Sequence, residues 1–207
     1  MTLTKQSEPA ILLGIVAACL LYSAVDPVAD RFTWFLETVP VMIGIGLLTW
    51  TRRRFPLTRL LYQLLALHAL ILIIGGHYTY AEVPLFNWLR DSFDLSRNHY
   101  DRIGHLAQGF IPAILAREIL LRRSPLQRDG WLLLAVTSIC LSFSAFYEMI
   151  EWWTALLSEE AAEAFLGTQG DAWDTQWDMF LALIGALSAQ LLLSRTHDNQ
   201  LSDLPVK

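Results

Sequence analysis

Long apolar stretches alternate with short polar segments along the whole chain. Six of these stretches come close to the ~20 apolar residues that a helix needs to cross a bilayer. Their approximate bounds are 9–25, 32–50, 60–76, 103–121, 131–150 and 177–194. A helix satisfies its own backbone hydrogen bonds, which is what a membrane requires. The pattern therefore predicts an all-α, polytopic membrane protein, a bundle of about six transmembrane helices in a single integral membrane domain over residues 1–207.

The composition agrees with this prediction. Of the 207 residues, 54% are hydrophobic, and the mean hydropathy is +0.39. A soluble domain of this length is normally less apolar. Outside the six stretches, residues 86–90 fit a short helix at the membrane surface, and the polar tail from Arg195 onward is expected to be frayed.

The basic residues fall mainly on one side of the predicted membrane. Eleven of the 15 Lys and Arg residues belong to the two termini, the loops 51–59 and 122–130, or a helix end on the same side. The other side has only Arg31, Arg90, Arg97 and Arg102. Because cytoplasmic loops are enriched in Lys and Arg, both termini are predicted to be cytoplasmic. Short basic loops of this kind do not make the broad patch that nucleic acid needs, which argues against nucleic acid as a partner.

The opposite, outer side carries most of the acids and histidines that lie near helix ends. Charge at membrane depth is costly, so such residues indicate a functional site. They are His77, Asp101, His105, Glu148, Glu151, Asp171, Asp174 and Asp178. Helical spacing decides which of them can converge.

The helix over 103–121 places Asp101 and His105 on one face, because they are four residues apart. A carboxylate one turn before a histidine can orient its imidazole or join it as a metal ligand. The alternative is an acid that caps the helix and a histidine at the membrane surface.

The helix over 131–150 carries a polar stripe that ends in Glu148 and Glu151. Two carboxylates three residues apart repel each other unless they share a proton or a cation. The alternative is two interfacial acids that reach into water.

The helix that contains the stretch 177–194 has acids at its start: Asp171, Asp174 and Asp178. The helix dipole favours acids in the first turn, which accounts for the first two but not for Asp178. The same face continues with small residues at Ala182, Gly185 and Ala189, which let helices approach closely. Asp178 is therefore expected to face the interior of the bundle.

Carboxylates and one imidazole on three helices suit a divalent cation such as Mn²⁺, Mg²⁺ or Zn²⁺. The candidate metal ligands are Asp101, His105, Glu148, Glu151, Asp174 and Asp178. His77 and Asp171 are expected at the periphery, and Glu37 could add a carboxylate. His68, alone at mid-membrane, favours a hydrogen bond between helices, and Glu118 with Arg122 favours a structural ion pair. The chain has no P-loop or dinucleotide fingerprint, so no organic cofactor is indicated.

Four segments resemble the YjdF-like family of bacterial inner-membrane proteins. They are YDRIGH at 100–105, QGF at 108–110, YEMIEW at 147–152 and GTQGDAWDTQWD at 167–178. The resemblance covers nearly the whole chain. It implies a multi-pass protein of the bacterial inner membrane. It does not indicate which activity the protein has.

The C-terminal half is also distantly similar to VanZ-like proteins, which are associated with glycopeptide-antibiotic tolerance. Asp101 and His105 match the Asp-x-x-x-His element of that family, and Glu148 and Glu151 match a pair with Glu in place of the usual Gln. The third element, Asp-x-x-x-Asn, is approximated by Asp174 and Asp178, and Gly185 falls later than expected. The departures make the site more acidic than the family pattern.

Three classes of function fit a site of this kind. The first is a membrane enzyme acting on a lipid-linked or small envelope ligand, with His105, Glu148 and Asp178 as candidate catalytic residues. The second is a proton- or ion-coupled transporter, in which Glu148 and Asp178 would titrate. The third is a non-catalytic envelope-assembly or stress protein, in which the polar cluster only holds helices together. In every case the lipid bilayer is a partner.

Overall fold

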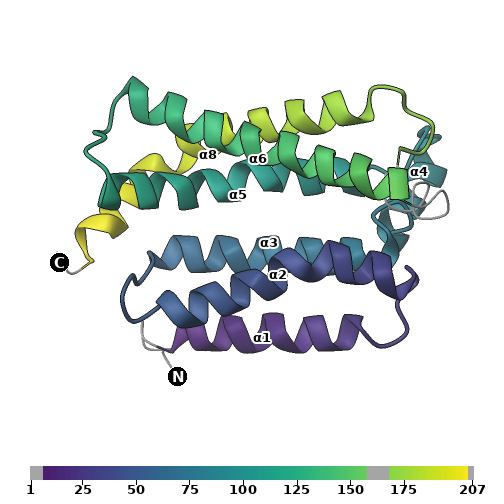
Figure 1. Cartoon of the computed structure of the whole chain (residues 1–207), viewed down its shortest axis with the longest axis horizontal. Coiled ribbons are helices and arrows are strands. Elements are labelled where there is room, and N and C mark those ends of the chain that lie inside the picture. Colours follow the sequence, from purple (N-terminus) through teal and green to yellow (C-terminus); the bar gives the residue numbers. More distant parts are fainter. Residues whose placement is uncertain (1–6, 158–167, 205–207) are drawn as a thin grey trace.

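The structure is a computed structural model that describes residues 7–157 and 168–204, and within these ranges it is helical without strands (Figure 1). The long helices are α1 (Glu8–Ser23), α2 (Arg31–Thr51), α3 (Arg59–Tyr78), α5 (Tyr100–Arg123), α6 (Gly130–Leu157) and α8 (Asp174–Ser202). A short helix, α4 (Pro84–Phe93), contains the predicted surface segment 86–90. The all-α prediction is confirmed, and each of the six predicted stretches forms a helix.

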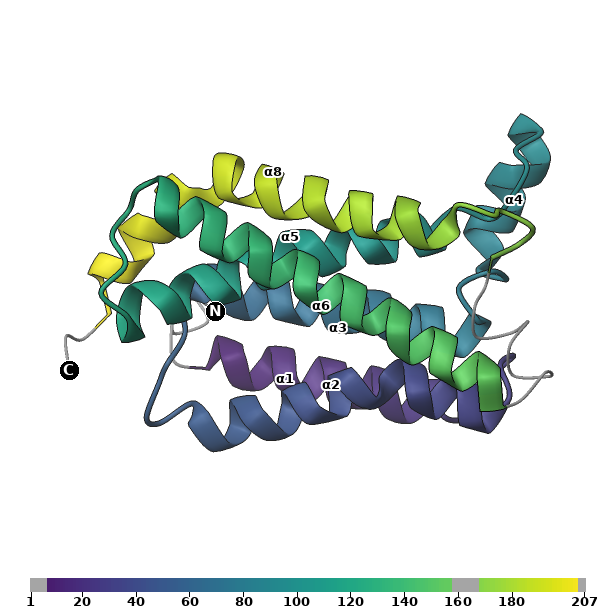
Figure 2. The same cartoon turned by 45° about the horizontal axis from the view of Figure 1, so that its top comes forward.

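The helices form two halves that lie side by side. α1 and α2 pack on α3 in one half, and α5, α6 and α8 pack on one another in the second (Figures 1 and 2). α3 joins the halves because it also packs against α5. The start of α1 and the end of α8 lie at the same end of the bundle, which we call the inner end; α4 lies at the other, outer end.

Four helices are long and apolar enough to cross a membrane: α2, α3, α6 and α8. α1 is apolar but has 16 residues, and α5 is long but carries charged residues near both ends. α5 nevertheless packs against α3, α6 and α8, and its Arg117 and Glu118 are buried. The number of six spanning helices stays a prediction.

α5 and α8 cross with their backbones in direct contact. A Cβ added at Gly109 of α5 would lie 1.9 Å from the carbonyl oxygen of Ala182, and one at Gly185 of α8 would lie 2.2 Å from that of Leu106. Ala186, one residue after Gly185, is fully buried. The predicted small-residue face of α8 is thus its contact with α5, and Asp178 on the same face is buried as expected.

The predicted fraying from Arg195 onward is wrong for residues 195–202, which continue α8. His197 is fully buried and its Nε2 lies 3.0 Å from Glu118 Oε2. Glu118 also accepts hydrogen bonds from Arg122 at 2.6 Å and from the hydroxyl of Thr58 at 2.8 Å. These contacts tie α3, α5 and α8 together at the inner end, and the predicted Glu118–Arg122 pair is confirmed. The polarity of the tail suggested fraying, but its polar groups have buried partners.

We expect Gly109→Ala to destabilise the protein because its new methyl group would meet backbone atoms that cannot move aside. Overpacking of this kind costs about 1–3 kcal/mol or more. Thermal unfolding of the purified protein in detergent measures the loss. Gly14→Ala is the matched control, since a Cβ there meets nothing within 4 Å. Equal melting temperatures for the two variants would contradict the close crossing.

Candidate functional site

The outer ends of α5, α6 and α8 bring the predicted residues together around one imidazole. His105 of α5 is buried, with 7% of its surface exposed. Its Nε2 lies 3.3 Å from Asp101 Oδ1 and 3.9 Å from Asp178 Oδ2. Its Nδ1 lies 3.8 Å from Glu148 Oε1. Three helices therefore contribute carboxylates to the two nitrogens of a single side chain.

Two overlapping groups have the spacing of metal ligands. In one, single ligand atoms of His105, Glu148 and Glu151 all lie within 4.8 Å of one another; in the other, the same holds for Asp101, His105 and Asp178. Ligand atoms ~2.1 Å from a shared cation lie roughly 3–4 Å apart, so a shift of about 1 Å would close either group. The two groups use His105 from opposite sides of its ring.

The first group contains polar atoms whose hydrogen-bonding capacity is unused. Among the described residues, neither His105 Nδ1 nor Glu148 Oε1 has a hydrogen-bond partner, although both atoms are buried. A buried polar atom without a partner typically costs about 1–3 kcal/mol. These two atoms face each other at 3.8 Å, so one cation between them would satisfy both.

Two arginines contact the acids of the second group. The positions of Arg97 and Arg102 in the sequence indicated only that they lie on the outer side. Arg102 contacts three acids: Asp171 at 2.8 Å, Asp174 at 2.9 Å and Asp178 at 3.0 Å. Arg97 pairs with Asp174 and lies 3.4 Å from Asp101. We call Arg97, Arg102 and these four acids the arginine cluster; it fixes the start of α8 on α5. The spacing of Arg97 and Asp101 by four residues could have indicated one of these pairs.

The two halves of the site thus differ in charge balance. The acids of α8 are matched by guanidinium groups, whereas no Lys or Arg of residues 7–157 and 168–204 forms an ion pair with Glu148 or Glu151. His105, when protonated, is the positive group that the described residues place beside Glu148.

Glu37 of α2 extends the acidic side of the site toward the other half of the molecule. It is buried, and it accepts a hydrogen bond of 3.2 Å from the hydroxyl of Tyr147, the residue before Glu148. α3 approaches α2 closely here, because a Cβ at Gly76 would lie 2.9 Å from Glu37 Cβ. Among the described residues, Glu37 belongs to neither group of possible metal ligands, so its contribution of a carboxylate stays a prediction.

Tyr80, which follows α3, closes the site between α3 and α5. Its ring would lie 2.2 Å from a Cβ at Gly75 and 3.0 Å from one at Gly104. Burial raises the pKa of Tyr80 well above its usual value, so its hydroxyl stays neutral. The position of Tyr80 just after the predicted helix 60–76 placed it on the outer side, whereas its contact with α5 depends on the space left by Gly75 and Gly104.

The two residues expected at the periphery have different surroundings. Asp171 contacts Arg102 and is partly exposed, at the edge of the arginine cluster. His77 belongs to another contact: its Nδ1 lies 2.9 Å from the carbonyl oxygen of Ser23, at the end of α1. His77 therefore connects α3 to α1, and within the described part of the chain it belongs to neither group of possible metal ligands.

Comparisons with known proteins show to which family the chain is similar. The family model described as "Predicted membrane protein (DUF2238)" matches residues 8–199. The chain is 49% identical over 202 residues to "Inner membrane protein YjdF" of Escherichia coli (strain K12), covering 96% of both chains. No solved structure matches. The similarity to VanZ-like proteins stays a prediction.

We expect Arg102→Gln to destabilise the protein, because it leaves the buried Asp178 without its arginine and removes one of the two arginines near Asp171 and Asp174. Breaking a buried pair costs about 3–5 kcal/mol. Adding Asp178→Asn should recover part of the loss, since it removes one unpaired charge. Thermal unfolding of the two single variants and the double variant measures this coupling.

Arg90→Gln is the matched control, because Arg90 pairs with Asp91 in an exposed position. Exposed pairs contribute about 0–1 kcal/mol. If Arg102→Gln is as stable as Arg90→Gln, the arginine cluster does not hold α8 on α5.

Proposed function

The chain belongs to the DUF2238 family of membrane proteins, and we propose that it binds a divalent cation between α5 and α6 at the outer end of the bundle. The proposed ligands are His105 Nδ1, Glu148 and Glu151. With this cation as a Lewis acid, the protein would act on a lipid-linked or small envelope ligand. The observation that carries the proposal is the pair of buried atoms without partners, His105 Nδ1 and Glu148 Oε1.

Asp101 supports this choice of nitrogen. A metal-bound histidine usually donates its other ring N–H to a carboxylate, which fixes the tautomer and makes the imidazole a better ligand. Asp101 Oδ1 lies 3.3 Å from Nε2 of His105. Asp101 is therefore proposed as the group that orients His105, with Nδ1 left for the cation.

The arginine cluster argues against a cation on the Nε2 side. Asp178 and Asp174 already bind Arg102, and a cation there would lie close to that guanidinium. Repulsion between the two positive charges would offset the attraction of the carboxylates. We therefore assign Asp174 and Asp178 a positioning role.

Three protein ligands leave coordination positions for water and substrate, which is the arrangement of catalytic rather than structural metal sites. One imidazole and two carboxylates suit Zn²⁺ or Mn²⁺ best among the cations considered. Trp152, Trp153 and Trp173 are exposed around this end of the bundle. Tryptophan favours the headgroup region, so a substrate there would be an amphiphile or a solute at the membrane surface.

An ion-coupled transporter is the alternative that the polar groups of the inner end would favour. Gln190 of α8 donates a hydrogen bond of 3.1 Å to Thr137 of α6, between the outer site and the Glu118–His197 pair. However, α5 and α8 are in backbone contact at Gly109 and Gly185, and Val136 and Ala186 are fully buried nearby. This packing closes the contact between α5 and α8 to an ion path, which weakens the case for transport.

The metal proposal predicts that the purified protein binds Zn²⁺ or Mn²⁺ with a stoichiometry near one. Glu148→Gln and His105→Ala should abolish binding, because each removes a ligand. Asp101→Asn should lower the affinity by about 10–100-fold through the orientation of His105. Calorimetric titration of chelator-treated protein, with elemental analysis of the dialysed complex, measures both.

Asp94→Asn is the control: it removes an exposed carboxylate from the same end, and Asn tolerates the left-handed conformation found there, with φ of 52°. Equal metal content in Glu148→Gln and Asp94→Asn would refute the site. Uptake of the cation into proteoliposomes by the wild type, lost in Glu148→Gln, would favour the transporter instead.

We also propose that the inner end is cytoplasmic, which places the site on the periplasmic side of a bacterial inner membrane. The basic residues near the inner end support this orientation. A C-terminal green fluorescent protein fusion should fluoresce, and a C-terminal alkaline phosphatase fusion should be inactive. The reverse result would place the site in the cytoplasm.

A further inference from the structure

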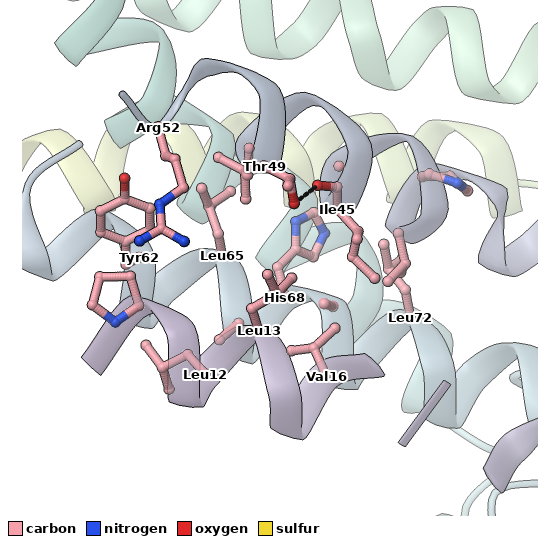
Figure 3. Close-up of a pocket in the computed structure, with 17 residues that line it drawn as sticks. Leu12, Leu13, Val16, Ile45, Thr49, Arg52, Tyr62, Leu65, His68 and Leu72 are labelled. Atoms are coloured by element: carbon pink, nitrogen blue, oxygen red, sulfur yellow. Dashed lines mark hydrogen bonds between the residues drawn. The ribbon is translucent and has the colours of Figure 1, made fainter. Parts of the chain in front are cut away.

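The first half of the molecule contains an apolar pocket that the outer site does not use. Its volume is about 140 Å³, and it lies among α1, α2 and α3 (Figure 3). Leu12, Val16, Ile45, Leu65 and Leu72 are among the side chains that line it. Since α2 and α3 have the length and hydropathy of membrane spans, the medium around this half is lipid.

A histidine is directed into this lining. The His68 ring extends from α3 into the pocket, among apolar side chains of α1 and α2 (Figure 3). Its Nε2 is buried and has no hydrogen-bond partner within the described part of the chain. An imidazole placed in this way can donate one hydrogen bond to a ligand. Among the described residues, the predicted hydrogen bond between helices therefore does not form at His68 Nε2.

The inner end of the pocket carries a cation. Arg52 and Tyr62 lie together at that end (Figure 3). Arg52 is exposed, and no ion pair or hydrogen bond of its side chain occurs among residues 7–157 and 168–204. His68 follows Tyr62 by six residues on α3, or ~9 Å along the helix axis. From the inner end outward, the pocket thus presents the cation of Arg52, the hydrogen-bond donor of His68 and then apolar side chains.

We propose that this pocket binds one acidic phospholipid of the surrounding bilayer. Its phosphate would bind Arg52, a glycerol-ester carbonyl would accept a hydrogen bond from His68 Nε2, and one acyl chain would lie against Ile45 and Leu72. The order of charge, donor and apolar surface matches the order of groups in a phospholipid. A free phosphate would leave the apolar lining unused. This inference does not depend on the proposed metal site, which lies in the other half.

Native mass spectrometry of the detergent-purified chain, mixed with defined lipids, tests the proposal. The probes are phosphatidylglycerol, phosphatidylcholine and an ether-linked phosphatidylglycerol that lacks ester carbonyls. Phosphatidylglycerol should bind with a stoichiometry of one and more tightly than phosphatidylcholine. Arg52→Ala should weaken phosphatidylglycerol binding about fivefold, the effect of one basic residue near an acidic headgroup. Arg53→Ala, an exposed neighbour outside the pocket, should change it little.

Two further pairs separate a lipid site from lipids that merely coat the helices. Gly44 lines the pocket and Gly46 does not, and a Cβ at either meets nothing within 4 Å. Gly44→Leu should therefore fill the pocket and abolish the tight site, whereas Gly46→Leu should retain it; melting temperatures show that both variants fold. His68→Leu should weaken binding of the ester lipid but not of the ether lipid.

Equal binding of the charged and zwitterionic lipids would overturn the proposal. So would equal effects of Gly44→Leu and Gly46→Leu, because a coat of nonspecific lipids would respond to neither substitution. Gly44→Leu could abolish phosphatidylglycerol binding while His68→Leu changes binding of the ester and ether lipids equally. That result would overturn the role assigned to His68.

Discussion

The close contact of α5 with α8 is the constraint on which the site depends. Gly109 and Gly185 allow the two backbones to touch, and this contact fixes both the distance and the register between the helices. With that register, Arg102 of α5 faces Asp174 and Asp178 of α8. A shift of one turn, ~5.4 Å, would separate these charges. In lipid, unpaired charges are expensive, so the packing of small residues and the pairing of charges support each other.

Buried polar groups are hydrogen-bonded differently at the two ends of the α5–α8 contact. At the inner end, Glu118 is completely surrounded by donors from Thr58, Arg122 and His197. At the outer end, His105 Nδ1 and Glu148 Oε1 have no such partners among residues 7–157 and 168–204. The inner network shows that this fold can satisfy a buried acid where the acid is structural. In the proposed function, a cation between these atoms would complete the outer end as the three donors complete the inner end.

Sequence patterns predicted the helices and several of their faces because both depend on local periodicity. The spacing of Asp101 and His105 and the small residues after Asp178 each placed a side chain on the correct face. Apart from the pair of Arg97 and Asp101, the arginine cluster could not be found in this way, because Arg97 and Arg102 meet acids of α8 about 70 residues further along the chain. The same limit applies to the tail: His197 is polar, and only its distant partner Glu118 explains why α8 continues there. Periodicity gives a face, and tertiary contacts decide which groups meet on it.

α3 connects the proposed lipid pocket to the outer site. One face of α3 supplies His68 to the pocket, while Gly75 and Gly76 near its outer end admit Tyr80 and Glu37. Glu37 in turn binds Tyr147, the neighbour of Glu148. Occupancy of the pocket would hold α1 and α2 against α3, and this packing sets how closely Glu37 approaches α6. The half with the apolar pocket is thus linked to the half with the carboxylates through direct contacts of one helix.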